Sequence, residues 1–228
     1  MALKAFIFDV DGTLVDSNML HVESWDRAFR RFGKQFSIAE LRRQIGKGSD
    51  QYLPEFLSQQ EIDDFGKELD TYRSELFQKE YLPRVRPFGN VRELFQRIRD
   101  DGKQIVLATS GKKVETHHYI KLLQIDDLIV GETTADDSEH SKPEPDIFEA
   151  ALKKLNDVSA QEALVVGDTR FDIEAAQKAD VRSIAFLCGG SSKRALQKAK
   201  PLAIFCDPAD LLVRYQEMPS LWAGDGAR

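Results

Sequence analysis

Short apolar runs recur along the chain, and stretches with helical periodicity separate them. The runs with strand character are Ala5–Phe8, Ile105–Ala108, Ala163–Val166 and Ser183–Phe186, with a weaker one at Ala203–Phe205. The helix-period stretches are Val91–Arg99, Val114–Leu123, Ile147–Leu155 and Ile173–Lys178. This alternation is typical of βαβ units, in which helices cover both faces of a parallel sheet. The pattern therefore predicts an α/β fold with a doubly wound parallel sheet.

One long segment breaks the alternation. From about Ser17 to Tyr81 no strand candidate occurs, and helical patterns follow one another instead. A capping box, Ser37-x-x-Glu40, marks the start of one of these helices. The prolines of Leu82–Pro87 cannot continue a helix and favour an extended linker on the far side. We therefore expect an all-helical subdomain inserted into the α/β core.

These boundaries divide the chain into three parts. Residues 1–16 and 83–216 are expected to form a Rossmann-like α/β core, and residues 17–82 a helical cap. Residues 217–228 show no periodicity and are expected to form a loose tail. A chain of 228 residues can bury a sufficient core without disulfides.

Charge and composition exclude several classes of protein. The 32 Lys and Arg against 38 Asp and Glu give a net charge of −6, which argues against nucleic-acid binding. The one basic run, Lys193–Lys200, is interpreted as the solvated face of a short helix. No apolar run approaches the roughly 20 residues of a membrane span, and Met1–Phe8 lacks the pattern of a signal peptide. Cys188 and Cys206 lie far apart and in no metal-binding grouping, which favours a reducing compartment, so we expect a cytoplasmic protein. The net charge and the lack of a long apolar run lead us to expect that it binds neither nucleic acid nor membranes.

Two aspartates directly follow the first predicted strand. In an extended backbone, the side chains of Asp9 and Asp11 can point the same way, so two carboxylates share one small space. Such a pair calls for a hard cation such as Mg²⁺, or for one carboxyl group to be held protonated. Gly12 and Thr13 then turn the chain and can present amides to an anion. A turn with solvated carboxylates is the alternative interpretation of this segment alone.

Further polar groups are expected at the same edge of the sheet. Thr109 closes the second core strand, and Ser110 begins the turn after it. Lys142 lies just before a predicted helix, and the two prolines that follow it stiffen the approach and give a fixed cation. Asp168 lies at the end of another core strand and Asp172 in the first turn of the following helix. Each residue alone is compatible with an ordinary surface or capping role. Together at the carboxyl ends of the strands, these groups indicate a site for phosphoryl transfer.

The sequence resembles the haloacid dehalogenase superfamily. Phe8–Leu14, Thr109, Lys142 and Gly167-Asp168-x-x-x-Asp172 are similar, in order, to the four motifs of that family, and the resemblance covers Ala5 to about Leu212. The helical insertion resembles the C1 cap of the phosphoglycolate phosphatase and β-phosphoglucomutase branch. Dehalogenases of this family have no acid at the position of Asp11, so dehalogenation is set aside.

The resemblance implies roles for the motif residues. Asp9 would be the nucleophile that forms an aspartyl-phosphate, and Asp11 the acid and base of the reaction. Thr109, Ser110 and Lys142 would hold the phosphoryl oxygens. The residues implied in binding Mg²⁺ are Asp9, Asp11 through its backbone carbonyl, Asp168 and, in support, Asp172.

The cap residues and the substrate are less constrained. Lys47, between Gly46 and Gly48, either reaches over the site from the cap or lies in a plain turn. His21 lies at the cap hinge, where mutases and some phosphatases of the branch also carry a histidine.

The leading interpretation is a Mg²⁺-dependent phosphatase, monomeric or a small homo-oligomer, that hydrolyses a small phosphorylated metabolite such as phosphoglycolate or a sugar phosphate. A phosphomutase is the second possibility. A phospho-accepting signalling domain is a distant third, because such domains are shorter and carry neither the second aspartate nor a cap.

Overall fold

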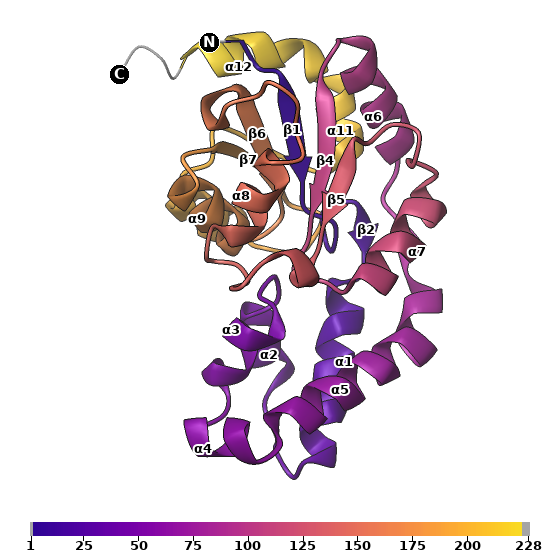
Figure 1. The fold of residues 1–228 in the computed structure, drawn as a ribbon, viewed down its shortest axis with the longest axis vertical. Coiled ribbons are helices and arrows are strands. Elements are labelled where there is room, and N and C mark those ends of the chain that lie inside the picture. Colours follow the sequence, from indigo (N-terminus) through magenta and orange to yellow (C-terminus); the bar gives the residue numbers. More distant parts are fainter. Residues whose placement is uncertain (1, 225–228) are drawn as a thin grey trace.

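The computed structural model describes residues 2–224 and contains a six-stranded sheet whose paired strands are all parallel (Figure 1). Its strands are β1 (Ala5–Phe8), β4 (Gln104–Ala108), β5 (Gly131–Thr133), β6 (Ala163–Gly167), β7 (Arg182–Phe186) and β8 (Ile204–Phe205). Their spatial order is β5-β4-β1-β6-β7-β8, so the chain winds outward from β1 in both directions. The sheet therefore has the doubly wound topology that the sequence predicts, with a switch point beside β1.

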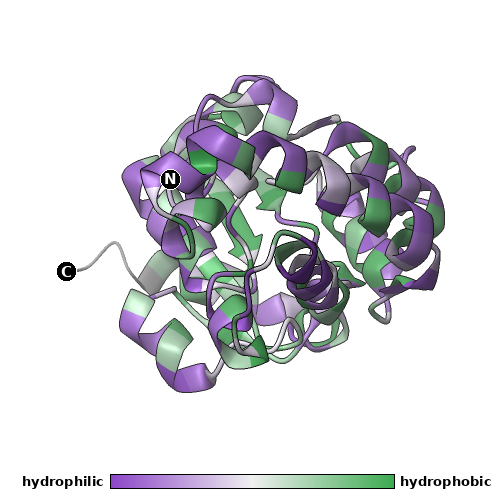
Figure 2. Cartoon of the chain, turned by 90° about the horizontal axis from the view of Figure 1, so that it is seen from below, coloured by the Kyte–Doolittle hydropathy of each residue, from purple (hydrophilic) through white to green (hydrophobic). Residues whose placement is uncertain are grey.

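Successive side chains of β1 point to opposite faces of the sheet, so this strand contributes apolar residues to both faces. Phe6 and Phe8 belong to one apolar cluster, and Ala5 and Ile7 to another. The first cluster includes side chains from α6 (Val91–Asp100), α7 (Lys113–Leu123), α11 (Pro208–Val213) and α12 (Met218–Gly224), and the second includes side chains from α8 (Asp146–Leu152) and α9 (Arg170–Lys178). A short helix, α10 (Lys193–Ala199), packs beside α9. Hydrophobic residues thus concentrate on the strands, while the exposed helix faces are largely hydrophilic (Figure 2).

A layer of helices lies beyond the carboxyl ends of the strands, below the sheet in Figure 1. It contains α1 (Asn18–Arg31), α2 (Ile38–Arg43), α3 (Ser49–Tyr52), α4 (Gln59–Glu61) and α5 (Lys67–Leu76), with π-helical segments Ile62–Gly66 and Phe77–Tyr81 on either side of α5. We call this layer the cap. The predicted capping box is present at the start of α2. The limits of the domains, at residues 16, 82 and 216, stay predictions.

The cap has an apolar core of its own. Trp25 and Phe29 of α1 pack there with Tyr52 of α3, and the rings of Trp25 and Tyr52 stack with their centroids 4.6 Å apart. Leu41 of α2 and Leu69 of α5 are completely buried in the same cluster. This cluster is separate from those on the two faces of the sheet, but Leu76 and Phe77 at the end of the cap belong to the cluster that contains Phe6 and Phe8.

An antiparallel ribbon connects the cap to the rest of the chain. Its strands are β2 (Val15–Asp16) and β3 (Arg86–Pro87), which the sequence analysis did not predict. Leu82–Pro87 was expected to be an extended linker, but its first part, Leu82–Arg84, forms a 3-10 turn. Proline at the first or second position is compatible with such a turn because that position needs no amide hydrogen. The ribbon places the entry and the exit of the cap side by side.

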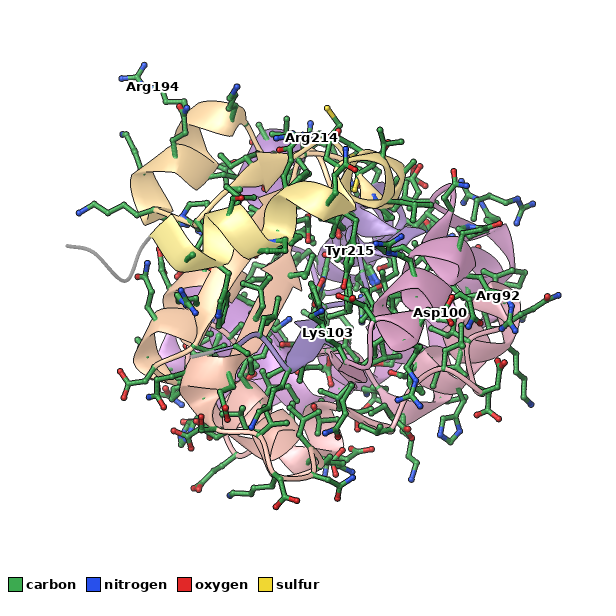
Figure 3. All side chains as sticks on the ribbon, turned by 90° about the horizontal axis from the view of Figure 1, so that it is seen from above. Arg92, Asp100, Lys103, Arg194, Arg214 and Tyr215 are labelled. Carbon is green, nitrogen blue, oxygen red and sulfur yellow. The ribbon has the colours of Figure 1, made fainter. Side chains whose placement is uncertain are left out.

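The prediction of a loose tail is wrong for residues 218–224. These residues form α12, and Met218 and Trp222, one helical turn apart, are buried in the core of the sheet. Seen from above, α12 lies across the molecule near Tyr215 (Figure 3), whose hydroxyl donates to Asp101 Oδ2 at 3.2 Å. The apolar period is too short to be recognised in the sequence. The rest of the predicted tail, residues 225–228, lies outside the described residues. No helix within residues 2–224 is long and apolar enough to cross a membrane.

Candidate active site

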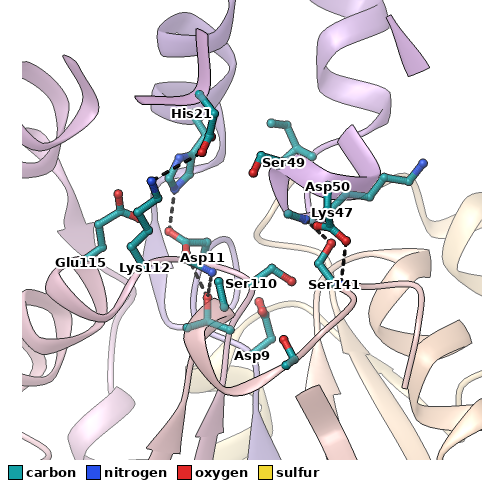
Figure 4. Close-up of a pocket in the computed structure, with 18 of the residues that line it drawn as sticks. Asp9, Asp11, His21, Lys47, Ser49, Asp50, Ser110, Lys112, Glu115 and Ser141 are labelled. Atoms are coloured by element: carbon teal, nitrogen blue, oxygen red, sulfur yellow. Dashed lines mark hydrogen bonds and ion pairs between the residues drawn. The ribbon is translucent and has the colours of Figure 1, made fainter. Parts of the chain in front are cut away.

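The carboxyl ends of β1 and β4 meet the cap at a cavity of 260 Å³ (Figure 4). The core lines it with Asp9, Asp11, Thr109, Ser110, Glu115 and Ser141, and the cap with His21, Trp25, Lys47, Asp50 and Arg73. Most residues predicted to form the site therefore line one cavity, at the switch point of the sheet.

Lys142 holds two of the predicted carboxylates. Its ammonium nitrogen lies 2.5 Å from Asp9 Oδ1 and 2.7 Å from Asp172 Oδ1, and it also donates to the carbonyl oxygen of Ala108 at 3.2 Å. The side chain is buried, 1 % exposed. Burial alone would lower the pKa of Lys142, but the charges of Asp172 and Asp9 raise it above its ordinary value, so the lysine stays charged.

Asp168 and Asp172 complete a cluster of three buried acids with Asp9. One ligand oxygen of each lies within 4.8 Å of the others. Asp168 accepts hydrogen bonds from Asn18 Nδ2 at 2.8 Å and from Thr13 Oγ1 at 3.3 Å. Burial raises the pKa of Asp9 to about 7, with Lys142 opposing, and burial and the neighbouring carboxylates raise that of Asp168 well above its ordinary value. Three carboxylates around a single lysine leave the cluster with a net negative charge. Because every available ligand atom is an oxygen, the cluster fits a hard divalent cation.

Asp11 lies outside this cluster and contacts the cap instead. Its Oδ1 accepts hydrogen bonds from Ser17 Oγ at 2.6 Å and from His21 Nε2 at 2.8 Å. Burial would raise the pKa of Asp11, but the contact with His21 and the hydrogen bond from Ser17 lower it to about 2. The carboxylate of Asp11 is therefore ionised and held in one orientation, while its role as acid and base and that of its backbone carbonyl as a metal ligand stay predictions.

The contact between Asp11 and His21 depends on a residue that the sequence analysis missed. Arg73, from α5, donates through a guanidinium nitrogen to His21 Nδ1. Because arginine can only donate, Nδ1 of His21 is the acceptor and its ring proton lies on Nε2, directed at Asp11. The His21 ring also stacks on Phe77, with centroids 4.0 Å apart. The cap thus orients the carboxylate of Asp11 through a chain of defined donors.

The remaining predicted residues differ in how they face the cavity. Thr109 is buried and accepts a hydrogen bond from the Gly111 amide at 2.9 Å, which shapes the turn that carries Ser110. Ser110 Oγ is buried without a hydrogen-bond partner among the described residues. Lys47 lines the cavity, but its ammonium group pairs with Glu55 at 2.5 Å and points away from Asp9 (Figure 4). Contact between Lys47 and a substrate stays a prediction.

Direct hydrogen bonds join the cap to the core around the cavity. The Gly48 amide donates to Ser141 Oγ at 2.9 Å, and the Ser141 amide donates to Asp50 Oδ2 at 2.9 Å. A Cβ atom at Gly48 would lie 2.7 Å from that of Ser141, so only glycine permits this approach. On another side of the site, Asn18 reaches from the cap to Asp168. The structure is therefore a closed form, in which the cap covers the reactive groups. This fold and this arrangement of side chains define a capped α/β enzyme.

Comparison with known proteins assigns the class more closely. The family model for haloacid dehalogenase-like hydrolases matches residues 6–186. A curated relative from Caldanaerobacter subterraneus, named "Putative pyrophosphatase PpaX", is 31% identical over 88% of this chain and 89% of its own. A relative from Thermotoga maritima, named phosphorylated carbohydrates phosphatase, is 27% identical over 80% of this chain and 84% of its own. The chain belongs to the haloacid dehalogenase-like hydrolases and is a phosphatase enzyme of that family.

Solved structures agree on the fold over nearly the whole chain. A hydrolase from Pseudomonas syringae has a TM-score of 0.86 and 29% identity, covering 94% of this chain and 98% of its own. A β-phosphoglucomutase from Clostridium difficile has a TM-score of 0.78 at 19% identity, covering 99% of this chain and 100% of its own. At that identity, the second likeness concerns the fold alone.

Proposed function

We propose that the protein is a Mg²⁺-dependent phosphatase that hydrolyses a small phosphorylated metabolite through an aspartyl-phosphate on Asp9. The observation that carries this proposal is the buried cluster of Asp9, Asp168 and Asp172 around Lys142, of which Asp9 lines the same cavity as Asp11. A second proposal is that the protein is a phosphomutase. A mutase would use the same groups but would move the phosphoryl group within a sugar phosphate rather than release it.

The residues divide the reaction into two displacements. A carboxylate oxygen of Asp9 attacks phosphorus and the bond to the leaving-group oxygen breaks, while Asp11 gives that oxygen a proton. Water then attacks the phosphorus of the aspartyl-phosphate, gives its proton to Asp11, and frees Asp9 and inorganic phosphate. Lys142 and the donors of Thr109 and Ser110 stabilise the charge on the phosphoryl oxygens throughout.

Asp11 must carry a proton for the first of these displacements. In the closed form its pKa is about 2, so it is ionised before substrate binds. A phosphate dianion beside it adds like charge, which raises the pKa and favours uptake of the proton that is later donated. His21 and Ser17, both held by the closed cap, orient the carboxylate during this transfer.

Mg²⁺ would be held by Asp9 and Asp168, with Asp172 in support and the backbone carbonyl of Asp11 as a further ligand. When bound, the metal supplies positive charge that neutralises the phosphoryl oxygens and the buried carboxylates. We further propose a cytoplasmic location, which the free thiols of Cys188 and Cys206 favour, and a monomer or small homo-oligomer.

Metal binding should stabilise the protein even without substrate. Because Mg²⁺ would relieve repulsion in the buried cluster, saturating Mg²⁺ should raise Tm by about 5 °C or more, and a chelator should reverse the shift. Differential scanning fluorimetry measures this directly. In Asp168→Asn the shift should be much smaller. An equal shift in that variant would place the metal elsewhere.

A panel of phosphate esters tests the proposed activity. Release of inorganic phosphate is followed with p-nitrophenyl phosphate, sugar phosphates, phosphoglycolate and pyrophosphate, with and without Mg²⁺. Many turnovers per protein molecule are expected with at least one ester. A mutase would instead move phosphate within a sugar phosphate with little net release. Absence of turnover on every compound would overturn both proposals.

A further inference from the structure

Glu115 is a buried acid that the proposed reaction does not use. It lies in the first turn of α7, is 1 % exposed, and lines the cavity on the same wall as Lys112, opposite Asp50 and Ser141 (Figure 4). Neither of its carboxylate oxygens has a hydrogen-bond partner among residues 2–224. A glutamate at this helix position commonly caps the backbone. The Lys112 backbone helps to lower the pKa of Glu115, but it forms no hydrogen bond of normal geometry with either carboxylate oxygen.

The cations near Glu115 are engaged with other groups. Lys112 pairs with Asp70 of the cap at 3.5 Å. Arg73 donates to His21 Nδ1 and, at 3.3 Å, to Ser24 Oγ, and it forms no ion pair with Glu115. Burial raises the pKa of Glu115, although the charge of Arg73 opposes this shift. Burying a carboxylate without donors costs free energy, so its place on a cavity wall indicates a ligand that supplies them.

Asp11 locates Glu115 relative to the reaction. Asp11 Oδ2 and Glu115 Oε2 each lie 3.4 Å from the position that a Cβ atom would take at Gly111, so the two carboxylates flank the same turn. Under the proposed function, Asp11 faces the leaving-group oxygen, which places Glu115 near the leaving group. The side of the cavity that receives the leaving group therefore presents an unpaired acid.

We propose that Glu115 is a specificity-determining residue that accepts a hydrogen bond from a hydroxyl or ammonium group on the leaving group of the substrate. This inference rests on the proposed phosphatase function and narrows its substrate class. Phosphate esters of polyols or amino alcohols carry such donors. Pyrophosphate and phosphoglycolate carry a second anion instead, which would face the Glu115 carboxylate without a donor.

The test compares substrates with and without donors. The wild-type protein and Glu115→Gln are assayed for kcat/KM on glycerol phosphate, phosphoethanolamine, pyrophosphate, phosphoglycolate and p-nitrophenyl phosphate. The wild type should prefer one or both donor-bearing esters, and the two esters separate a hydroxyl from an ammonium partner. The variant should lose about 10- to 100-fold on the preferred ester, because a charged acceptor is replaced by a neutral one. Its rate on p-nitrophenyl phosphate should stay within about threefold, since that leaving group offers no donor.

A stability measurement separates this role from a structural one. Without ligand, Glu115→Gln should raise Tm by about 2–4 °C, because the variant no longer buries an unpaired charge. Glu93→Gln, an exposed substitution on α6, should change neither Tm nor any rate. A lower Tm with equal losses on all esters would make Glu115 structural and overturn the proposal.

The substrate preference itself is a second way to overturn the proposal. Wild-type preference for pyrophosphate or phosphoglycolate over both donor-bearing esters would refute the role of Glu115 while leaving a phosphatase. If no ester, including p-nitrophenyl phosphate, is hydrolysed, the proposed function fails first, and the specificity role fails with it.

Discussion

Replacing Asp9 with Asn should reduce phosphatase turnover by about 10⁴-fold or more and leave no phosphoenzyme. An amide is a far weaker nucleophile than a carboxylate, and Asp9 is the carboxylate that Lys142 contacts at the floor of the cavity. Asn has nearly the shape of Asp and removes one of three clustered acids, so folding should be retained. Steady-state phosphate release gives the rate, and mass spectrometry after acid quenching detects the phosphoenzyme.

Two variants make this result specific. Asp126→Asn, an exposed change of the same kind, should have wild-type activity. Asp11→Asn should slow both displacements but still bind substrate, and combining it with Asp9→Asn should add little further loss. Near-normal turnover by Asp9→Asn, under conditions that exclude deamidation, would show that Asp9 is not the nucleophile.

Replacing Lys142 with Met should have the second-largest effect, on stability as well as activity. The ammonium group lies 2.5 Å from Asp9 and 2.7 Å from Asp172, and Met fills a similar volume without the charge. Removing one partner of a buried ion pair costs about 3–5 kcal/mol, so Tm should fall clearly in the absence of metal. Activity should fall by about 10³-fold, because the phosphoryl oxygens lose their fixed cation.

Mg²⁺ should recover more stability in Lys142→Met than in the wild type, because more negative charge is left unbalanced. Thermal unfolding with and without Mg²⁺ measures the difference. Lys178→Met is the matched control, since Lys178 pairs with Glu144 at the surface and such pairs contribute little. Equal Tm values for Lys142→Met and the wild type would mean that Lys142 does not stabilise the acidic cluster.

Strands with continuous apolar runs could be predicted from the sequence, and the others could not. β1 and β6 are buried on both faces, so every residue is apolar or small and the signal is local. β5 was missed because its three residues, Gly131–Thr133, are polar or small and pair only with β4. α12 was missed because only two of its described side chains, Met218 and Trp222, are buried, which is too few for a recognisable apolar period.

The residues of the site also fall into those that could be predicted from the sequence and those that could not. Asp9, Lys142 and Asp168 follow or precede core elements directly, so topology alone predicts that they meet. Arg73 and Glu115 carry no such signal, because each lies within a helix whose period explains it equally well as a surface residue. Their roles depend on how the cap packs on the core, which is tertiary information. The cap contacts around Asp11 were therefore found only in the structure.

The ribbon of β2 and β3 makes the cap an exchangeable module. Val15 pairs with Pro87 and Asp16 with Arg86, so the two ends of the inserted segment lie side by side. A different helical segment could be grafted between these two strands without lengthening or re-registering any strand of the parallel sheet. Such grafts would keep Asp9, Lys142 and Asp168 in place while exchanging His21, Arg73 and the cap side of the cavity. Across descendants of one ancestral chain, chemistry and substrate choice could then diverge at different rates.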